Sequence, residues 1–298
     1  RVAAAASSAP VVHRTIPSIR ALRKSLPPSV SVGYVPTMGA LHDGHLSLVR
    51  EARARNDVVV ASIFVNPTQF APGEDLDRYP RQLERDTELL AESGVDHLFA
   101  PDGDAMYGEN HVTYVDPTGF DDTSEGRSRP GHFRGVATVV TKLFNIVRPD
   151  VAYFGQKDAA QCVAIRRIAS DLDMDVRVEV LDTVREGDGL AMSSRNAYLT
   201  DEERRAAPVV YRSLVAARDV MRGRRGEEGG SKAKVKASEL EGVVREVLGS
   251  ERLVSEVQYV AVDSKETMRP LEEVGEEGAV ISLACKVGSV RLIDNIVL

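Results

Sequence analysis

The chain has 298 residues, of which 43% are hydrophobic, so it can bury a sizeable core and is about two domains long. Its net charge of -7 argues against a basic stripe that neutralises nucleic-acid phosphates, so we expect no nucleic-acid partner. No apolar run approaches the roughly 20 residues that a membrane-spanning helix needs, so we expect no membrane partner either.

The N-terminal stretch RVAAAASSAPVV is rich in Ala and Ser, and no acidic residue occurs before Asp43. Such acid-poor starts occur in organelle transit peptides, and a disordered leader is the plainer interpretation. We therefore predict a disordered leader over residues 1–12 and a cytoplasmic protein, with an organelle location as the alternative. Cys162 and Cys285 suggest neither a disulfide framework nor a metal site, so we expect two ordinary core thiols.

Short apolar runs alternate with helical patterns through the first part of the chain. Strands are predicted at residues 30–36, 57–67, 95–101, 151–155 and 176–183, and helices at 45–56, 76–93, 135–148 and 158–173. Near-continuous apolar strands are typical of a sheet that is covered on both faces. The alternation therefore predicts an α/β fold, with a Rossmann-like parallel sheet over residues 13–185. Residues 111–117 are a candidate for an extra strand or hairpin.

The pattern changes after about residue 186. Helices are predicted at 200–223 and 237–248, and strands at 256–264, 278–288 and 290–298. We therefore expect a smaller C-terminal α/β domain over residues 186–298. Thr200 and Glu203 have the spacing of a capping box at a helix start. The charged, glycine-rich stretch 222–236 predicts a mobile loop and not a nucleic-acid patch.

The stretch PTMGALHDGH follows the first predicted strand and leads into a helix. Ligands of an open parallel sheet bind beyond the carboxyl ends of its strands, and a helix start favours phosphate. Gly39 and Gly44 allow backbone amides to approach a ligand. His42 and His45, three residues apart, are placed to donate hydrogen bonds to phosphate oxygens. Metal ligation and a core or capping role are the alternatives for this pair.

Three further clusters lie at predicted strand ends or near the domain junction. Lys157 in FGQKD can reach a polyphosphate, and a surface pair with Asp158 is the alternative. Residues 193–195 in LAMSSRN offer hydroxyl and guanidinium donors that suit phosphate, although this sequence is common in loops. Asn66 and Gln69 in FVNPTQF suit hydroxyl and carboxylate groups, with turn formation around the proline as the alternative.

The HDGH and MSSR segments resemble the paired signatures of the nucleotidyltransferase superfamily, which includes class I aminoacyl-tRNA synthetases. With FVNPTQF and FGQKD, the chain resembles the pantothenate synthetase (pantoate–β-alanine ligase) family from about Val30 to the C-terminal RLIDNI. The resemblance implies an ATP-dependent ligase that condenses pantoate with β-alanine through a pantoyl adenylate, releasing pyrophosphate and AMP. It also implies small-molecule partners, Mg²⁺ alongside ATP, a homodimer, and a C-terminal domain that closes over the ATP site.

The resemblance also implies roles for individual residues. The catalytic residues would be His45, His42 and Lys157. The ATP site would comprise Met38, Gly39, Ala40, Leu41, His42, Asp43, Gly44, His45, Gly155, Gln156, Lys157, Asp158, Val184, Met192, Ser193, Ser194 and Arg195. Contacts with pantoate or β-alanine would come from Gln69, Gln161 and Asn66. Gln156 stands where the family more usually has Glu. Asp86 would contact Mg²⁺, although a carboxylate on such a helix is more often solvated.

Three rival functions share part of this pattern. A nucleotidyltransferase that joins a nucleotide to a phosphorylated substrate would have the His-x-x-His turn but would form no amide. A non-catalytic nucleotide sensor would bind ATP without exchanging pyrophosphate. A tRNA-charging enzyme would need an RNA-binding module, and this acidic sequence shows none.

Overall fold

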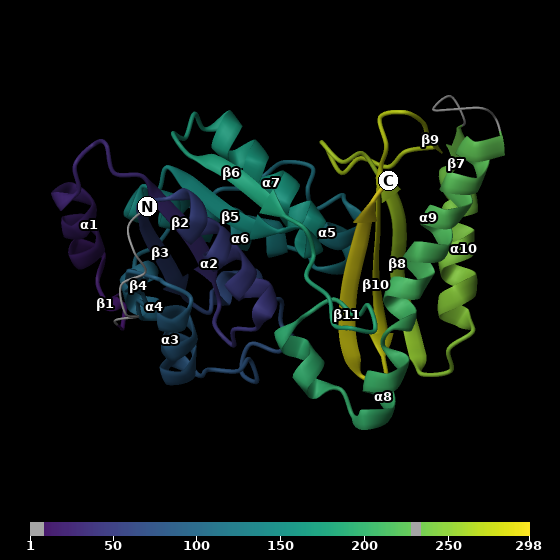
Figure 1. Cartoon of the computed structure of the whole chain (residues 1–298), viewed down its shortest axis with the longest axis horizontal. Coiled ribbons are helices and arrows are strands. Elements are labelled where there is room, and N and C mark those ends of the chain that lie inside the picture. The colour runs from purple at the N-terminus through teal and green to yellow at the C-terminus, as the bar shows by residue number, and fades with distance from the viewer. Residues whose placement is uncertain (1–8, 228–233) are drawn as a thin grey trace. The chain divides into compact units, whose positions relative to one another are not determined.

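The computed structural model describes residues 9–227 and 234–298, and contacts between Cα atoms divide the chain into two compact units (Figure 1). Unit 1 comprises residues up to 118 together with 131–155 and 164–182. Unit 2 comprises residues 119–130, 156–163 and 183–298. The predicted domains 13–185 and 186–298 are continuous in sequence, whereas these units are interleaved along the chain.

Unit 1 is built on a six-stranded parallel sheet with the order β1-β4-β3-β2-β5-β6. Its strands are β1 (Val11–His13), β2 (Val32–Thr37), β3 (Val58–Ile63), β4 (His97–Phe99), β5 (Val151–Gly155) and β6 (Arg177–Leu181). The chain runs outward from β2 through β3 to β4 and then restarts on the other side of β2 with β5. The topological switch point therefore lies between β2 and β5, where ligands of such sheets bind.

The helices of this part of the chain connect the parallel strands, as the α/β pattern predicts. They are α1 (Ile16–Ser25), α2 (Asp43–Arg55), the 3-10 turn η1 (Pro67–Gln69), α3 (Leu83–Glu92), α4 (Gly103–Met106), α6 (His132–Val147) and α7 (Ala159–Asp171). The helix predicted to begin at residue 76 starts only at Leu83. Pro80 explains the delay, because proline lacks an amide hydrogen and disfavours helical backbone in the residue before it.

Two sequence predictions for unit 1 are wrong. Val11 and Val12 belong to β1 and pair with β4, so the predicted disordered leader does not extend through residue 12. The amide of Val11 donates to the Asp96 carbonyl at 3.0 Å, and β1 is stabilised by this backbone ladder. Residues 1–8 of the predicted leader lie outside the described residues. Residues 111–117 form neither a strand nor a hairpin.

Unit 2 contains a three-stranded antiparallel sheet with the order β11-β10-β8 (Figure 1). Its elements are α5 (Ser124–Ser128), the turn η2 (Gln156–Asp158), the turn η3 (Ser194–Tyr198), α8 (Asp201–Ala206), α9 (Val209–Glu227), β7 (Val235–Lys236), α10 (Ala237–Gly249), β8 (Val254–Asp263), β9 (Glu273–Val274), β10 (Val280–Val287) and β11 (Val290–Val297). Helices α9 and α10 pack against this sheet. Every second residue of β10 from Ile281 to Val287 enters the shared core, as a strand with one covered face requires.

The capping box of Thr200 and Glu203 is confirmed at the start of α8. The single helix predicted over 200–223 is wrong, because the chain breaks it into α8 and α9 at Pro208. The predicted loop 222–236 is also wrong at both ends. Its residues up to 227 continue α9 and its last two form β7, while 228–233 lie outside the described residues.

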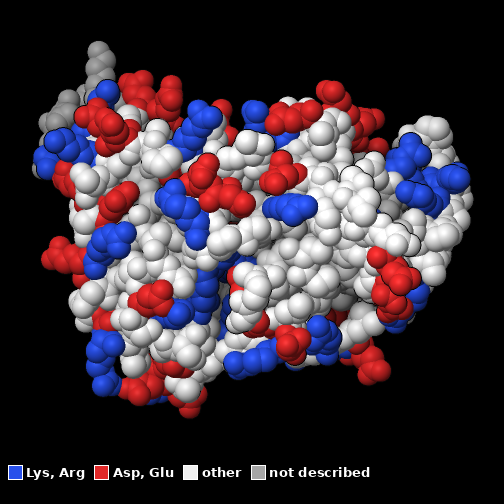
Figure 2. Space-filling model, turned by 180° about the vertical axis from the view of Figure 1, so that it is seen from behind, with Lys and Arg blue, Asp and Glu red and all other residues white. Residues whose placement is uncertain are grey.

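The two thiols follow the sequence prediction of core cysteines. On the face shown in Figure 2, acidic and basic side chains are interspersed. Within residues 9–227 and 234–298, no helix has both the length and the apolar character to cross a membrane. Cys162 and Cys285 are both buried. Burial raises the pKa of the Cys285 thiol to about 12, which keeps it protonated and unreactive.

Candidate active site

The turn between β2 and α2 has a backbone that only a few residues tolerate. Gly39 has φ 88° and Ala40 has φ 52°, both in the left-handed region. A Cβ on Gly39 would lie 3.0 Å from the Asp86 carboxylate, so glycine serves both the conformation and the close approach. The chain therefore turns sharply at the carboxyl end of β2, next to the switch point.

Asp86 of α3 holds this turn. Its two carboxylate oxygens accept the amides of Ala40 at 2.8 Å and Leu41 at 2.9 Å. Its side chain is 1% exposed. Charge-assisted bonds to backbone amides are among the stronger hydrogen bonds in proteins. The carboxylate therefore fixes the backbone just ahead of the two histidines.

The same geometry does not fit Asp86 as a Mg²⁺ ligand. Both oxygens already bind amides, and the side chain is closed off from solvent. Among the described residues, no group of three His, Cys, Asp or Glu side chains is arranged to hold a metal ion. We therefore assign Asp86 a structural contact with the turn.

His42 and His45 form a capping box at the start of α2. Nδ1 of His42 accepts the Gly44 amide at 3.1 Å, and Nδ1 of His45 accepts the His42 amide at 3.4 Å. The rings lie 4.0 Å apart between centroids. A ring nitrogen that accepts a hydrogen bond carries no proton, so each neutral ring bears its proton on Nε2. The capping alternative is thus what the structure contains, and it orients both donors.

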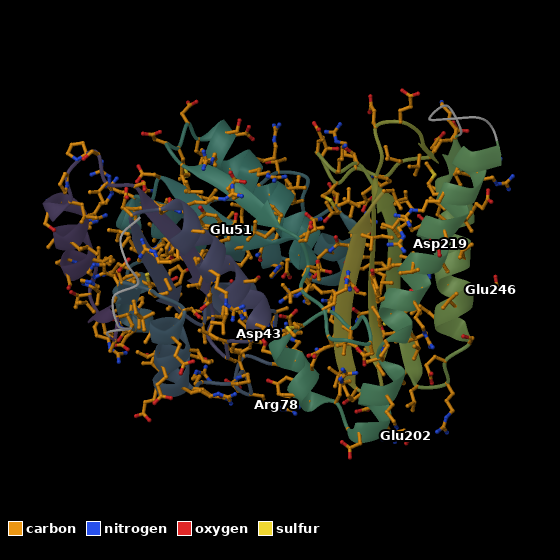
Figure 3. All side chains as sticks on the ribbon, viewed as in Figure 1. Asp43, Glu51, Arg78, Glu202, Asp219 and Glu246 are labelled. Carbon is orange, nitrogen blue, oxygen red and sulfur yellow. The ribbon has the colours of Figure 1, made fainter. Side chains whose placement is uncertain are left out.

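Asp43, which the resemblance adds to the ATP segment, is the first residue of α2 (Figure 3). Its carboxylate is exposed and pairs with Arg50 at 3.2 Å. A carboxylate in the first helical turn is favourable because the helix dipole is positive there. This contact stabilises the helix that carries the histidines.

Asn66, Gln69 and Met38 are brought together at η1. Nδ2 of Asn66 donates to Oε1 of Gln69 at 3.0 Å, and Nε2 of Gln69 lies 3.3 Å from the Met38 sulfur. Asn66 and Gln69 are both buried. The arrangement fixes which end of the Gln69 amide donates and which accepts.

Four residues around η1 were not identified from the sequence. Tyr107 and Thr68 both donate to Oδ1 of Asn66, at 2.8 and 2.9 Å. Burial raises the pKa of Tyr107, which keeps its hydroxyl a donor. The His132 ring bonds the Gln69 carbonyl at 3.0 Å, and a Cβ on Gly135 would lie 2.3 Å from the Thr68 carbonyl oxygen. The sequence GHFRGV, which unites a histidine with two glycines, was the available signal for the last pair.

Unit 2 carries the remaining ATP-site candidates. Several of them line one cavity, namely Lys157, Asp158, Ser193 and Arg195. Arg129 and Arg291, which the sequence did not single out, line the same cavity, so four cations surround it. Met192 donates its amide to the Val184 carbonyl at 3.0 Å, which brings these two candidates together. Gln161 is half-buried on α7 and is not among the residues that line this cavity.

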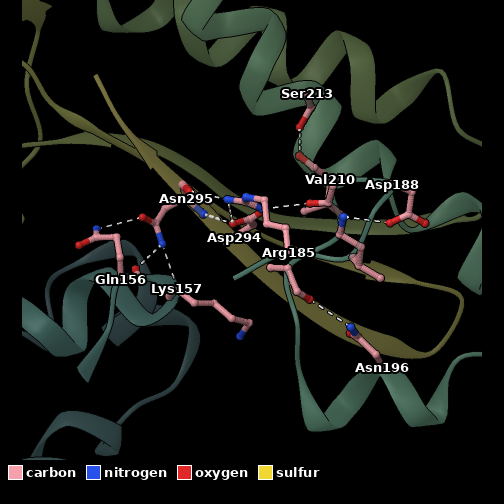
Figure 4. A network of polar contacts seen from close by, with 12 residues as sticks. Gln156, Lys157, Arg185, Asp188, Asn196, Val210, Ser213, Asp294 and Asn295 are labelled. Carbon is pink, nitrogen blue, oxygen red and sulfur yellow. Dashed lines mark hydrogen bonds and ion pairs between the residues drawn. The ribbon is translucent and has the colours of Figure 1, made fainter. Parts of the chain in front are cut away.

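Gln156 makes a long-range hydrogen bond that the local sequence does not predict. Its Nε2 donates to Oδ1 of Asn295 at 3.1 Å, at the far end of β11 (Figure 4). Gly155 ends β5 immediately before this turn. The parallel sheet of unit 1 therefore carries a histidine-capped turn at its switch point, which is where α/β proteins of this class bind their ligands.

The chain belongs to the pantoate–β-alanine ligase family, whose model matches residues 11–297. Pantothenate synthetase of Pelotomaculum thermopropionicum is 51% identical over 97% of this chain and 99% of its own length. The crystal structure of pantothenate synthetase from Thermus thermophilus superposes with a TM-score of 0.86 at 46% identity, covering 96% of this chain and 98% of that one. The protein is therefore an ATP-dependent ligase that forms pantothenate from pantoate and β-alanine.

A further solved relative was crystallised with nucleotide and amine. Pantoate–β-alanine ligase from Francisella tularensis, complexed with β-γ ATP and β-alanine, superposes with a TM-score of 0.76. It is 34% identical and covers 97% of this chain and 98% of that one. The two bound molecules correspond to two of the three substrates that the sequence resemblance implies.

Proposed function

We propose that His42 and His45 of unit 1 and Lys157 of unit 2 bind the phosphates of ATP while pantoate is activated. The observation that carries this proposal is the histidine capping box, which leaves the proton of each neutral ring on Nε2. Preorganised donors stabilise charge as it develops on departing pyrophosphate without reorganising at the moment of reaction. The histidines thus combine a structural role with a catalytic one.

The reaction needs this activation because a carboxylate is a poor acyl donor. A pantoate carboxylate oxygen attacks the α-phosphorus of ATP, and the bond to pyrophosphate breaks. The resulting mixed anhydride has AMP as its leaving group, so the amine of β-alanine attacks the acyl carbon and forms the amide. The protein acts chiefly by positioning these groups and by stabilising charge.

The remaining ATP contacts are proposed for the residues that flank these three. They are Met38, Gly39, Ala40, Leu41, Asp43, Gly44, Gly155, Gln156, Asp158, Val184, Met192, Ser193, Ser194 and Arg195. The cluster of Lys157 and Arg195 on one cavity supports the phosphate assignment, because two cations suit a polyphosphate better than one. Mg²⁺ is proposed as a companion of ATP, bound through phosphate oxygens and not through Asp86.

Pantoate binding is proposed for Gln69 and Gln161, with Asn66 orienting Gln69. The hydrogen bond from Asn66 to Oε1 of Gln69 supports this assignment, since it leaves the Gln69 amide group as the donating end. A carboxylate accepts hydrogen bonds from such donors. The resemblance also implies that Gln69 lies close to β-alanine.

A homodimer and a cytoplasmic location are also proposed. Val112 is 84% exposed in segment 111–117, which belongs to no helix or sheet of the described residues. An exposed apolar side chain on such a surface segment suits an interface. Sedimentation equilibrium would test the dimer.

A two-step assay tests the function and separates it from its rivals. Pantoate-dependent exchange of labelled pyrophosphate into ATP is expected, because adenylate formation is reversible on the enzyme. Amide formation is expected only when β-alanine is then supplied. A nucleotide sensor would show no exchange, and a simple nucleotidyltransferase would form no amide.

A further inference from the structure

Asn295 on β11 binds the backbone of the turn that carries Lys157. Its Nδ2 donates to the carbonyls of Gln156 and Lys157, both at 2.9 Å. Its Oδ1 accepts from Nε2 of Gln156 at 3.1 Å, which orients the amide (Figure 4). Asn295 is 2% exposed, so water does not replace these three bonds. The turn is thereby tied to a strand far away in the sequence.

A buried ion pair between Arg185 and Asp294 fixes the backbone of β11 at Asn295. Arg185 binds Asp294 through two bonds of 2.6 and 3.0 Å, and it donates to the Asn295 carbonyl at 3.3 Å. Its guanidinium stacks on the Tyr211 ring, 3.8 Å from the centroid. Burial raises the pKa of Asp294, and the Arg185 charge acts against this rise. A two-point guanidinium–carboxylate pair fixes direction as well as distance, so β11 presents Asn295 in one orientation.

These contacts place Lys157 in unit 2, although the strand before it belongs to unit 1. Ser193 and Arg195 belong to the same unit and line the same cavity as Lys157. Figure 4 shows the Lys157 side chain extending away from the amide pair, while its backbone stays bound. Fixing the backbone matters for lysine, because its four-carbon stem already spreads the ammonium over many positions.

We propose that Asn295 is a positioning residue for ATP, which locks the turn of Lys157 to β11 so that Lys157 and Arg195 bind phosphate as one rigid set. This inference rests on the proposed phosphate contact of Lys157. Asn295 is buried, and its effect passes through the backbone of residues 156 and 157. Small displacements of a positioned group can cost large factors in rate or affinity.

A double-mutant cycle tests the proposal with the full-length protein. The affinity for a non-hydrolysable ATP analogue is measured by calorimetry for wild type, Asn295→Ala, Lys157→Ala and the double variant. Asn295→Ala should weaken binding by about tenfold in the wild-type background and hardly at all in the Lys157→Ala background. The Michaelis constant for pantoate should stay near wild type, because Gln69 and Gln161 are not bound by Asn295.

The alternative outcomes are distinct. Equal losses in both backgrounds would overturn the positioning role and leave Asn295 a purely structural residue. Unchanged binding in Lys157→Ala alone would overturn the phosphate role of Lys157, and the present inference with it. Asn295→Ser keeps one hydrogen-bond donor, so its affinity for the analogue should fall less. It replaces Asn295→Ala in the cycle if Asn295→Ala does not fold. Asn145→Ala is the matched control, since Asn145 also donates to a backbone carbonyl, that of Thr141 at 3.0 Å, but lies on α6 of unit 1.

Discussion

The two turns that carry the phosphate-binding candidates are held in different ways. The turn with His42 and His45 is held by bonds within four residues and by Asp86 of α3, in the same unit. The turn with Lys157 is held by Asn295, which lies 138 residues further along the chain. A motif that caps its own helix can be recognised from the local sequence. The contacts of a motif that is held by a distant strand cannot be recognised in this way.

The buried carboxylates of the two units show the same contrast. Asp86 in unit 1 and Asp263 in unit 2 are each 1% exposed. Asp86 accepts two backbone amides, whereas Oδ2 of Asp263 has no hydrogen-bond partner among residues 9–227 and 234–298. Burial and the nearby Glu241 raise the pKa of Asp263 to about 7, although Arg127 opposes them. One carboxylate therefore stabilises its turn, and the other opposes folding when it ionises.

The largest effect is expected at His45. His45→Ala should lower pantoate-dependent pyrophosphate exchange by about 10²–10³-fold, because one preorganised donor is lost. Conversion of supplied pantoyl adenylate by β-alanine should persist, since pyrophosphate has then already left. His45→Glu is the matched variant, because glutamate at this position of a capping box keeps the acceptor for the His42 amide. Restored exchange in His45→Glu would show that capping alone matters.

Asp263 should make the stability of the protein depend on pH. The carboxyl of the folded state keeps its proton up to about pH 7, whereas the unfolded chain loses it near its ordinary pKa of 3.8. Stability is therefore lost as pH rises from about 4 to about 7, by at most about 4 kcal/mol. Asp263→Asn should remove this slope and melt higher than wild type at pH 8.5. If the melting temperatures of both proteins changed with pH in the same way between pH 5.5 and 8.5, the assignment would be contradicted.

Asp86→Asn should destabilise the protein by about 1.5–3 kcal/mol, because an amide group replaces one of two acceptors that bind backbone amides. Urea unfolding measures this loss. Asp263→Asn should have the opposite effect above pH 7, because there it stabilises the protein. The concentration of Mg²⁺ needed for half-maximal activity should stay the same. A large rise in that concentration would restore the metal role that the geometry of Asp86 does not fit.

The smallest effects are expected at the two pantoate candidates. Gln69→Ala and Gln161→Ala should each weaken pantoate binding by about 1–3 kcal/mol and leave the affinity for ATP nearly unchanged. Gln69→Ala should also lower the melting temperature, because Gln69 is buried and bonded to Asn66, whereas half-buried Gln161 should not. Steady-state kinetics with varied pantoate checks both, and an unchanged Michaelis constant would reject the residue concerned.

The sequence alone determined the parts that depend on local patterns. Apolar runs alternating with helical periodicity predicted the parallel sheet, because a strand covered on both faces must be apolar throughout. The HDGH turn was found for a similar reason, since its glycines and histidines act within a few residues of one another. Prolines 80 and 208 show the limit of periodicity, because each shortened or split a helix that the apolar spacing alone predicted.

Only the tertiary structure decided which residues support the site. Gln156 bonds to Asn295, and Tyr107 and His132 make contacts around η1. These contacts join segments far apart in the sequence, and no local pattern predicts them. Asp86 is the clearest case, because a carboxylate on a helix is usually solvated, yet here the fold buries it against two amides. Hydrogen bonds are short-ranged and directional, so which groups satisfy one another is settled only when the chain has folded.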